Sequence, residues 1–132
     1  MNTLTKNSVL MSEITEILKT NKTFQYLTNQ EIKNFVKKSK IIRYPDNHQI
    51  IAQGEIQSTI FIILEGFVKV QIEKDGILSQ VATLGEGELV GETALFSDMP
   101  RTAFVISDKN VLTLQIERKD FLDYLKSNPY AG

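Results

Sequence analysis

The 132-residue chain contains no cysteine, so it can form neither a disulfide framework nor a thiolate nucleophile. Long hydrophobic runs are missing too. The longest stretch of aliphatic and aromatic residues, Ile60 to Leu64, is far too short to cross a bilayer, and the amino terminus lacks the apolar region of a signal peptide. We therefore expect a soluble, cytoplasmic protein in a reducing compartment, with no membrane partner.

Charge of one sign is not in excess either. Fifteen lysines and arginines face sixteen acidic residues, which gives a formal net charge of −1. A nucleic-acid-binding surface normally shows as a basic excess, so we expect no nucleic-acid partner. The length suits one domain that buries roughly two thirds of its unfolded-chain surface.

Signatures of catalysis and metal binding are also missing. The sequence has no Gly-x-x-x-x-Gly-Lys-Ser/Thr loop and no Gly-x-Ser-x-Gly nucleophile elbow. The sole histidine, His48, has no metal-ligating partners at a defined spacing, and we interpret it as a surface or turn residue. Glu86, Glu88 and Glu92 could supply an acid–base pair for glycoside chemistry, but the neighbouring glycines and Arg101 favour binding. We expect no enzyme activity, no metal and no cofactor.

A helical period gives way to an alternating one near Ser39. Apolar residues recur at helical spacing over Val9–Lys19, and Thr28 to Glu31 has the form of a capping box that starts a helix over Asn29–Lys38. We expect residues 1–40 to form a helical segment that packs on a β-barrel spanning residues 41–132, all within one domain. The alternative role for the first helix is a contact in a homodimer.

Beyond Ser39, glycines punctuate short runs rich in Ile, Val and Phe about every ten residues, which is typical of an antiparallel sandwich or barrel. Lys74-Asp75-Gly76 predicts a hairpin turn, because Asp-Gly tolerates positive φ. The fold class we predict is α+β, mainly β: an eight-stranded antiparallel jelly-roll barrel flanked by N-terminal and C-terminal helices. The expected strands are Ile41–Tyr44, His48–Gln53, Thr59–Leu64, Phe67–Glu73, Leu78–Leu84, Glu88–Val90, Arg101–Ser107 and Asn110–Ile116, and a helix follows over Glu117–Ser127.

The segment from Gly85 to Ser107 carries the candidate site. Three glycines fall within residues 85–91, and Arg101, one of three arginines in the chain, follows a short apolar stretch. Glycine lets the backbone approach a ligand closely, and amides that open a short helical turn can donate to a phosphate. Arg101 can bind two phosphate oxygens, and the Glu92 carboxylate can accept from a sugar hydroxyl. The pattern indicates a nucleotide whose singly charged phosphate lies next to its ribose.

At these residues the chain resembles the phosphate-binding cassette of the cyclic-nucleotide-binding domain family. The matching segments are Val90-Gly91-Glu92-Thr93-Ala94-Leu95 and Pro100-Arg101-Thr102-Ala103, and similarity extends over roughly residues 24–128. The resemblance implies that Glu92 binds the ribose 2′-hydroxyl and that Arg101 binds the exocyclic phosphate oxygens. It also implies the jelly-roll barrel (double-stranded β-helix). The ligand-binding residues we expect are Gly91, Glu92, Thr93, Ala94, Arg101 and Thr102.

The resemblance leaves the base and the output open. The Thr102 hydroxyl could meet the 2-amino group of guanine, but threonine also occurs in relatives that prefer adenine, so we expect cyclic AMP rather than cyclic GMP. We expect a regulatory sensor in which movement of Leu95 and Phe96 reaches an effector protein. The alternative is a scaffold without ligand that docks a partner through its N-terminal helix or the lysines at residues 37–40. Relatives usually continue into a lid helix, whereas three residues follow Pro129, so the chain is a stand-alone sensor or part of a longer protein.

Overall fold

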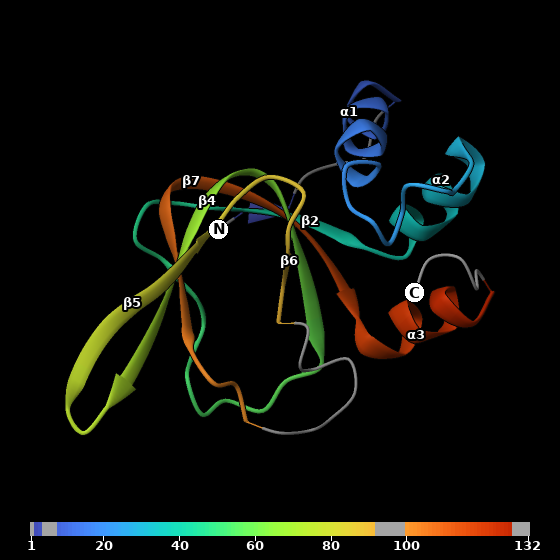
Figure 1. Cartoon of the computed structure of the whole chain (residues 1–132). Helices are drawn as coiled ribbons and strands as arrows, with labels where there is room; N and C mark the ends of the chain where they lie inside the picture. Colours follow the sequence, from blue (N-terminus) through green and yellow to red (C-terminus); the bar gives the residue numbers. More distant parts are fainter. Residues whose placement is uncertain (1, 4–7, 92–99, 128–132) are drawn as a thin grey trace.

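The computed structural model describes residues 2–3, 8–91 and 100–127, which form one antiparallel sheet and three α-helices (Figure 1). The helices gather on one side of the β-structure, and a long hairpin projects from the other (Figure 1). The elements, in chain order, are β1 (Asn2–Thr3), α1 (Ser8–Leu18), α2 (Asn29–Lys37), β2 (Lys40–Tyr44), β3 (Gln49–Ile51), β4 (Thr59–Lys74), β5 (Ile77–Leu84), β6 (Leu89–Val90), β7 (Phe104–Glu117) and α3 (Arg118–Ser127).

Two long strands form the middle of the sheet. The strand order is β1-β2-β7-β4-β5, with β3 also paired to β7 and β6 also paired to β4. β4 and β7 pair from Thr59, opposite Glu117, to Gln71, opposite Phe104. Their register shifts around Gly66, which has φ +89° and where a Cβ would collide with the carbonyl oxygen of Asn110. The glycine therefore allows the two strands to stay paired across an irregular step.

The prediction of eight strands in a closed barrel is not confirmed, because the sheet is open and its strands are divided differently. The predicted strands Thr59–Leu64 and Phe67–Glu73 are one strand, β4, and the last two predicted strands are one strand, β7, which begins at Phe104 rather than Arg101. The turn signal at Gly66 produces an irregularity within the β4–β7 ladder instead of a chain reversal, and Lys109 of β7 lies in the same irregular step at φ 63°. The short strand β1 was not predicted.

The helices bind the sheet through a large apolar cluster. The rings of Phe24, Phe35 and Phe121 lie 5.1 to 6.2 Å apart between centroids. Ile14 and Leu18 of α1 are fully buried in the same cluster. Sheet residues complete it, among them Ile41, Ile60, Ile62, Leu64, Leu112, Leu114 and Ile116.

Two local sequence signals are confirmed. The Thr28 Oγ1 accepts from the Glu31 amide at 3.1 Å, and a Glu31 carboxylate oxygen accepts from the Thr28 amide at 3.0 Å, so the capping box opens α2. Asp75 and Gly76 have φ of 54° and 78° and connect β4 to β5 as a tight hairpin. Both signals depend only on residues close together in the chain.

A second, smaller cluster lies within the curve of the strands. It contains Ile51, Phe61, Ile63, Val68, Val90, Val105 and Val111. β3, β4, β6 and β7 contribute to it, and three of its members, Ile51, Val90 and Val105, also line the cavity described next.

Candidate ligand-binding site

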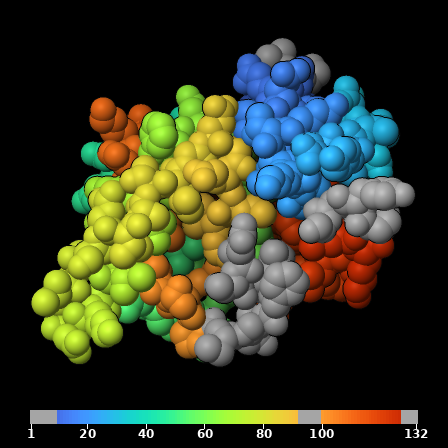
Figure 2. All heavy atoms as spheres, viewed as in Figure 1, coloured from blue at the N-terminus to red at the C-terminus, as the bar shows by residue number. Residues whose placement is uncertain are grey.

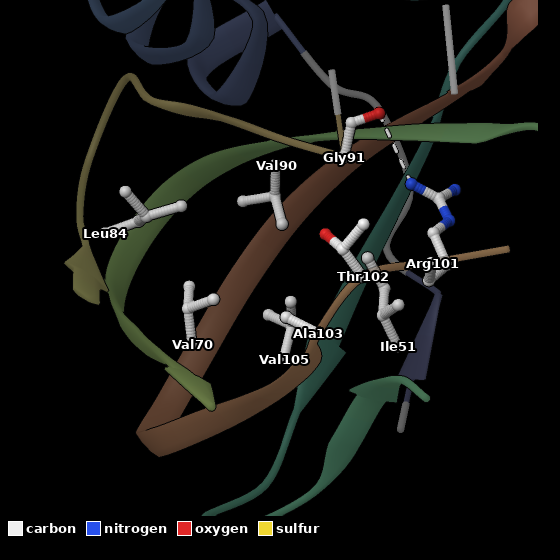
Figure 3. Close-up of a pocket in the computed structure, with 9 residues that line it drawn as sticks. All are labelled: Ile51, Val70, Leu84, Val90, Gly91, Arg101, Thr102, Ala103 and Val105. Carbon is white, nitrogen blue, oxygen red and sulfur yellow. Dashed lines mark hydrogen bonds between the residues drawn. The ribbon is translucent and has the colours of Figure 1, made fainter. Parts of the chain in front are cut away.

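A cavity of ≈ 180 Å³ opens inside the curve of the strands, with an apolar end and a polar end (Figure 3). Leu84 and Val70 lie at the apolar end, and the guanidinium of Arg101 lies at the other end, close to Gly91 (Figure 3). Nine residues from five strands and the segment before β7 line the cavity: Ile51, Val70, Leu84, Val90, Gly91, Arg101, Thr102, Ala103 and Val105.

Arg101 is a buried cation, with 4% of its surface exposed. Its Nη2 donates to the carbonyl oxygens of Thr59 at 2.7 Å and Gln57 at 3.4 Å, and its Nη1 donates to the carbonyl oxygen of Gly91 at 3.3 Å. A guanidinium carries five N–H donors, so these three bonds leave two donors over. One of them is on Nε, which is buried and has no hydrogen-bond partner among the described residues.

The charge of Arg101 is only weakly compensated. All three acceptors of its side chain among the described residues are neutral carbonyls. Burial lowers the pKa of Arg101 because the charged form loses hydration, and the nearby Glu55 carboxylate partly opposes this shift. A buried cation without an ion-pair partner is costly, and an anion within reach of its free donors would relieve that cost.

The backbone of Arg101 is fixed to the loop between β3 and β4. Its amide donates to the Glu55 carbonyl at 2.7 Å, and its carbonyl accepts from the Gly54 amide at 2.8 Å. The Glu55 side chain, in turn, accepts from the Gln57 side-chain amide at 2.5 Å and from the Ala52 amide at 3.4 Å. The two backbone hydrogen bonds of Arg101, to Gly54 and Glu55, fix the position from which its side chain extends.

Gly91 can only be a glycine in this arrangement. Its φ is +84°, and a Cβ at this position would overlap Arg101 Nη1. The residue therefore lets the backbone and the guanidinium approach each other closely. The sequence predicted a close backbone approach at a glycine, and Gly91 is where such an approach, to Arg101, is found.

The turn before β6 connects the site to the N-terminal segment. Gly87 donates its amide to the Ile63 carbonyl at 2.7 Å, and its own carbonyl accepts from Asn21 Nδ2 at 3.0 Å. A Cβ on Gly87, which has φ +85°, would meet Thr20 Oγ1 at 2.5 Å. The short strand β6 separates Gly87, which contacts the residues after α1, from Gly91, which lines the cavity.

The structure brings three of the predicted site residues together. Gly91, Arg101 and Thr102 line the same cavity, and their role in binding stays a prediction. Glu92, Thr93 and Ala94 lie outside the described residues, as do Leu95 and Phe96, so their expected roles also stay predictions. Thr102 reaches the cavity because it lies in a bend before β7. The predicted strand start at Arg101 was wrong, because β7 begins at Phe104.

Two of the candidate acid–base carboxylates are placed by the structure. Glu86 and Glu88 are exposed, and a Glu88 carboxylate oxygen accepts from the Gly85 amide at 2.6 Å, within its own turn. His48 is half-buried and directly follows the turn at residues 46–47: its amide donates to Ser107 Oγ at 2.8 Å, and its ring lies 5.1 Å from that of Tyr44. No three metal-ligating side chains gather anywhere in the described part of the chain.

Sequence reasoning missed most of the cavity wall. The apolar lining residues Ile51, Val70, Leu84 and Val105 come from four different strands. Alternation of apolar and polar residues marks inward-facing positions of a strand, but only pairing between strands shows which of them border a cavity. The carbonyls that hold the guanidinium left no signal at all, because a backbone oxygen exists at every residue.

None of the helices in the described segments is long and apolar enough to span a bilayer. The prediction of a cytoplasmic location is not tested by this observation.

Comparison with known proteins gives one family. The family model described as "Cyclic nucleotide-binding domain" matches residues 41–128. The chain is similar to the cGMP-dependent protein kinase of Plasmodium berghei, with 36% identity over 104 residues that cover 78% of this chain and 12% of that protein. It is also similar to the cAMP-dependent protein kinase regulatory subunit of Mucor circinelloides f. lusitanicus, with 31% identity over 94 residues, or 66% of this chain and 22% of that protein. The chain thus spans a small part of these relatives.

Solved structures show the same fold. The regulatory domain of Toxoplasma gondii PKA, crystallised with cAMP, matches with a TM-score of 0.84 at 21% identity, over 93% of this chain and 47% of that one. A cyclic nucleotide-binding domain from Methylobacillus flagellatus matches with a TM-score of 0.83 at 22% identity, over 98% of this chain and 74% of that one.

Proposed function

Because this chain belongs to the cyclic nucleotide-binding domain family, we propose that its cavity binds a cyclic nucleotide, cyclic AMP in preference to cyclic GMP, and that binding regulates a larger protein or a partner. The observation that carries the proposal is the state of Arg101. It is 4% exposed, bonded only to neutral carbonyls among the described residues, and retains a buried Nε–H without an acceptor.

The polar end of the cavity suits a cyclic phosphodiester. Such a group carries one negative charge, and the two remaining Arg101 donors can bind its two exocyclic oxygens. Gly91 keeps side-chain atoms away from this corner. Glu92 is proposed to bind the ribose 2′-hydroxyl, and the backbone at Thr93 and Ala94 to complete the phosphate cradle.

The apolar end suits the purine ring. Val70, Leu84 and Val90 offer aliphatic surface for a base, and none of the described residues at that end of the cavity is charged. At ≈ 180 Å³ the cavity is smaller than the roughly 300–1,000 Å³ typical of drug-sized ligands. A whole nucleotide therefore extends past its mouth.

The same lining supports the preference for adenine. Among the described residues that line the cavity, Thr102 is the one with a side-chain hydroxyl. Guanine has more polar edge groups than adenine, and each one that is buried without a partner costs free energy. A mostly aliphatic wall with one hydroxyl therefore favours cyclic AMP.

Signal transmission would begin at Arg101. Phosphate binding draws the guanidinium away from the Gly91 carbonyl, and β6 connects Gly91 to the turn at Gly87, which is bonded to Asn21. Regulation requires that the ligand bind one arrangement of this connection more tightly than another. The proposed output is a change in how the N-terminal helices sit on the sheet.

Calorimetric titration with cyclic AMP and cyclic GMP tests the function. We expect binding of both, with a smaller dissociation constant for cyclic AMP. Tighter binding of cyclic GMP would reverse the base preference and leave the site intact. If neither nucleotide binds at about millimolar concentration, where the binding free energy falls to about −4 kcal/mol, the scaffold alternative is correct.

A further inference from the structure

The side chain of Gln53, which follows β3, pairs with the end of β4. Its Nε2 donates to the Glu73 carbonyl oxygen at 2.9 Å, and its Oε1 accepts from the Glu73 amide at 2.8 Å. Glu73 lies close to the tip of the β4–β5 hairpin, which projects from the body of the molecule (Figures 1 and 2). A primary amide that binds both backbone groups of one residue makes the contact that a neighbouring antiparallel strand would make.

This contact is available because β7 does not extend along β4 as far as the hairpin tip. β7 begins at Phe104, so its ladder with β4 ends at Gln71. Glu73 lies beyond Gln71, and residues two apart in an antiparallel ladder direct their N–H and C=O groups to the same side. β5 flanks the other side of β4, where Leu78 is the partner of Glu73. Gln53 therefore bonds backbone groups that β7 leaves over.

The turn that follows Gln53 holds Arg101. The Gly54 amide donates to the Arg101 carbonyl oxygen at 2.8 Å, and the Glu55 carbonyl accepts from the Arg101 amide at 2.7 Å. The Glu55 amide donates to the Ala52 carbonyl at 3.1 Å, and the φ of +87° at Gly54 lets the chain turn this tightly. Gln53 and Gly54 are consecutive, so a movement of Gln53 away from β4 also moves the backbone to which Arg101 is bonded.

Gln53 thus connects the two ends of the cavity without lining it. Val70, at the apolar end, precedes Glu73 on β4, and Arg101 forms the polar end (Figure 3). Gln53 is not among the nine described residues that line the cavity. A ligand that contacts both ends depends on their spacing, because binding groups must be held to within about 0.5 Å of the productive geometry.

We propose that Gln53 is a positioning residue of this site: it ties the turn after β3 to the end of β4 and so fixes where the Arg101 side chain begins relative to the apolar end. Gln53 acts through Arg101 rather than on a ligand directly. Its effect on binding rests on the proposed function, whereas its hold on Arg101 needs no ligand and is measured separately.

Hydrogen exchange of the ligand-free protein, followed by NMR, tests the hold on Arg101. Gln53→Met keeps the length of the side chain and removes both hydrogen bonds to Glu73. We expect the amides of Gly54 and Arg101 to exchange at least about tenfold faster than in the wild type, because the turn opens more often. Unchanged exchange at these two amides overturns the proposal.

Thr28→Ala is the control for a general loss of stability. It removes the capping box of α2, far from Arg101 in the chain, and lowers the stability of the whole fold by a comparable amount. Exchange at Gly54 and Arg101 should stay within about threefold of the wild type in this variant, because a local opening of the turn does not involve α2. An equal acceleration in both variants overturns the proposal, since the turn would then open only when the whole domain unfolds.

Gln53→Glu separates the hydrogen bonds from the packing of the side chain. At neutral pH the new carboxylate can accept from the Glu73 amide but cannot donate to its carbonyl, so exchange at Gly54 and Arg101 should again be faster than in the wild type. Below about pH 4 the protonated carboxyl group regains an O–H donor, and the ratio of these rates to those of the wild type should fall toward one. The other carboxyl groups are common to both proteins, so the ratio at each pH isolates the new one. A ratio that stays high at low pH contradicts the proposal.

Calorimetric titration with cyclic AMP then tests the effect on binding. Gln53→Met should raise the dissociation constant at least about fivefold, because part of the binding free energy is lost in ordering Arg101. Thr28→Ala should leave the dissociation constant within about twofold of the wild type, since its loss of stability does not alter the folded cavity. An unchanged dissociation constant in Gln53→Met overturns the role in binding. If the wild type binds no cyclic nucleotide, the proposed function fails, and the exchange rates still decide whether Gln53 holds Arg101.

Discussion

Replacing Arg101 by methionine keeps a side chain of similar length and removes the charge and all five donors. In the protein without ligand, the carbonyls of Thr59, Gln57 and Gly91 lose a donor, at about 0.5–1.5 kcal/mol each. Removal of a buried cation that has no ion-pair partner in the described part of the chain offsets this loss. We therefore expect the unfolding free energy of the ligand-free protein to change by no more than about 2 kcal/mol.

The effect on binding should be much larger. Two Arg101 donors remain for a phosphate, and each charge-assisted hydrogen bond contributes about 1.5–3 kcal/mol. Their loss should raise the dissociation constant by roughly 10²- to 10⁴-fold. Thermal unfolding measures the difference. Cyclic AMP at a hundred times the wild-type dissociation constant stabilises the folded state by about 2.7 kcal/mol. With about 2.1 cal/mol/K of unfolding entropy for each of 132 residues, the wild-type midpoint should rise by roughly 10 °C.

At that ligand concentration the Arg101→Met site is at most half occupied, so its midpoint should rise by less than about 2 °C. Arg43→Met is the matched control, because it removes an arginine whose Nη2 lies 3.3 Å from a Glu65 carboxylate oxygen on the surface. Its ligand-induced shift should equal that of the wild type. If cyclic AMP raised the midpoint of Arg101→Met by an amount within about 2 °C of the rise seen for the wild type, the guanidinium would not hold the phosphate.

Three further predictions concern single residues. Gly91→Ala should lower the unfolding free energy by about 1–2 kcal/mol and weaken cyclic AMP binding, because the added Cβ meets Arg101 at a φ of +84°. The control Gly76→Ala, at φ +78° in open space, should lose stability but keep its affinity for cyclic AMP. Equal losses of affinity in the two variants would contradict the steric reasoning. Burial and the nearby Glu31 raise the pKa of Tyr124 above its ordinary value of 10.0. The folded state therefore keeps the phenol proton to higher pH than the unfolded state does, and the unfolding free energy should fall as the pH rises above about 10. The urea midpoint should fall less steeply with pH in Tyr124→Phe than in the wild type, and parallel curves would refute this. Thr102→Val should weaken cyclic GMP binding more than cyclic AMP binding by calorimetry; the opposite order would show that the hydroxyl serves the adenine nucleotide.

The sequence by itself determined the local features of this protein. The capping box at Thr28 and the hairpin at Asp75-Gly76 were predicted correctly, because hydrogen bonds and dihedral preferences within four residues decide them. The spacing of glycines and Arg101 pointed to the right family for a similar reason, since the binding pattern is a short segment of chain. The division into a 1–40 helical segment and a 41–132 barrel domain stays a prediction.

Only the tertiary structure decided how the strands divide and what surrounds Arg101. Gly66 is a turn signal in the sequence, yet the β4 residues before and after it both pair with β7, so β4 is one continuous strand. The acceptors of the Arg101 guanidinium at Gln57 and Thr59 are 44 and 42 residues away in the chain. Backbone carbonyls have no residue identity, and long-range strand pairing depends on the combined fit of many side chains. For that reason the sequence could single out Arg101 as a candidate, but only the folded sheet could show that this cation is buried and that its side-chain acceptors among the described residues are all neutral carbonyls.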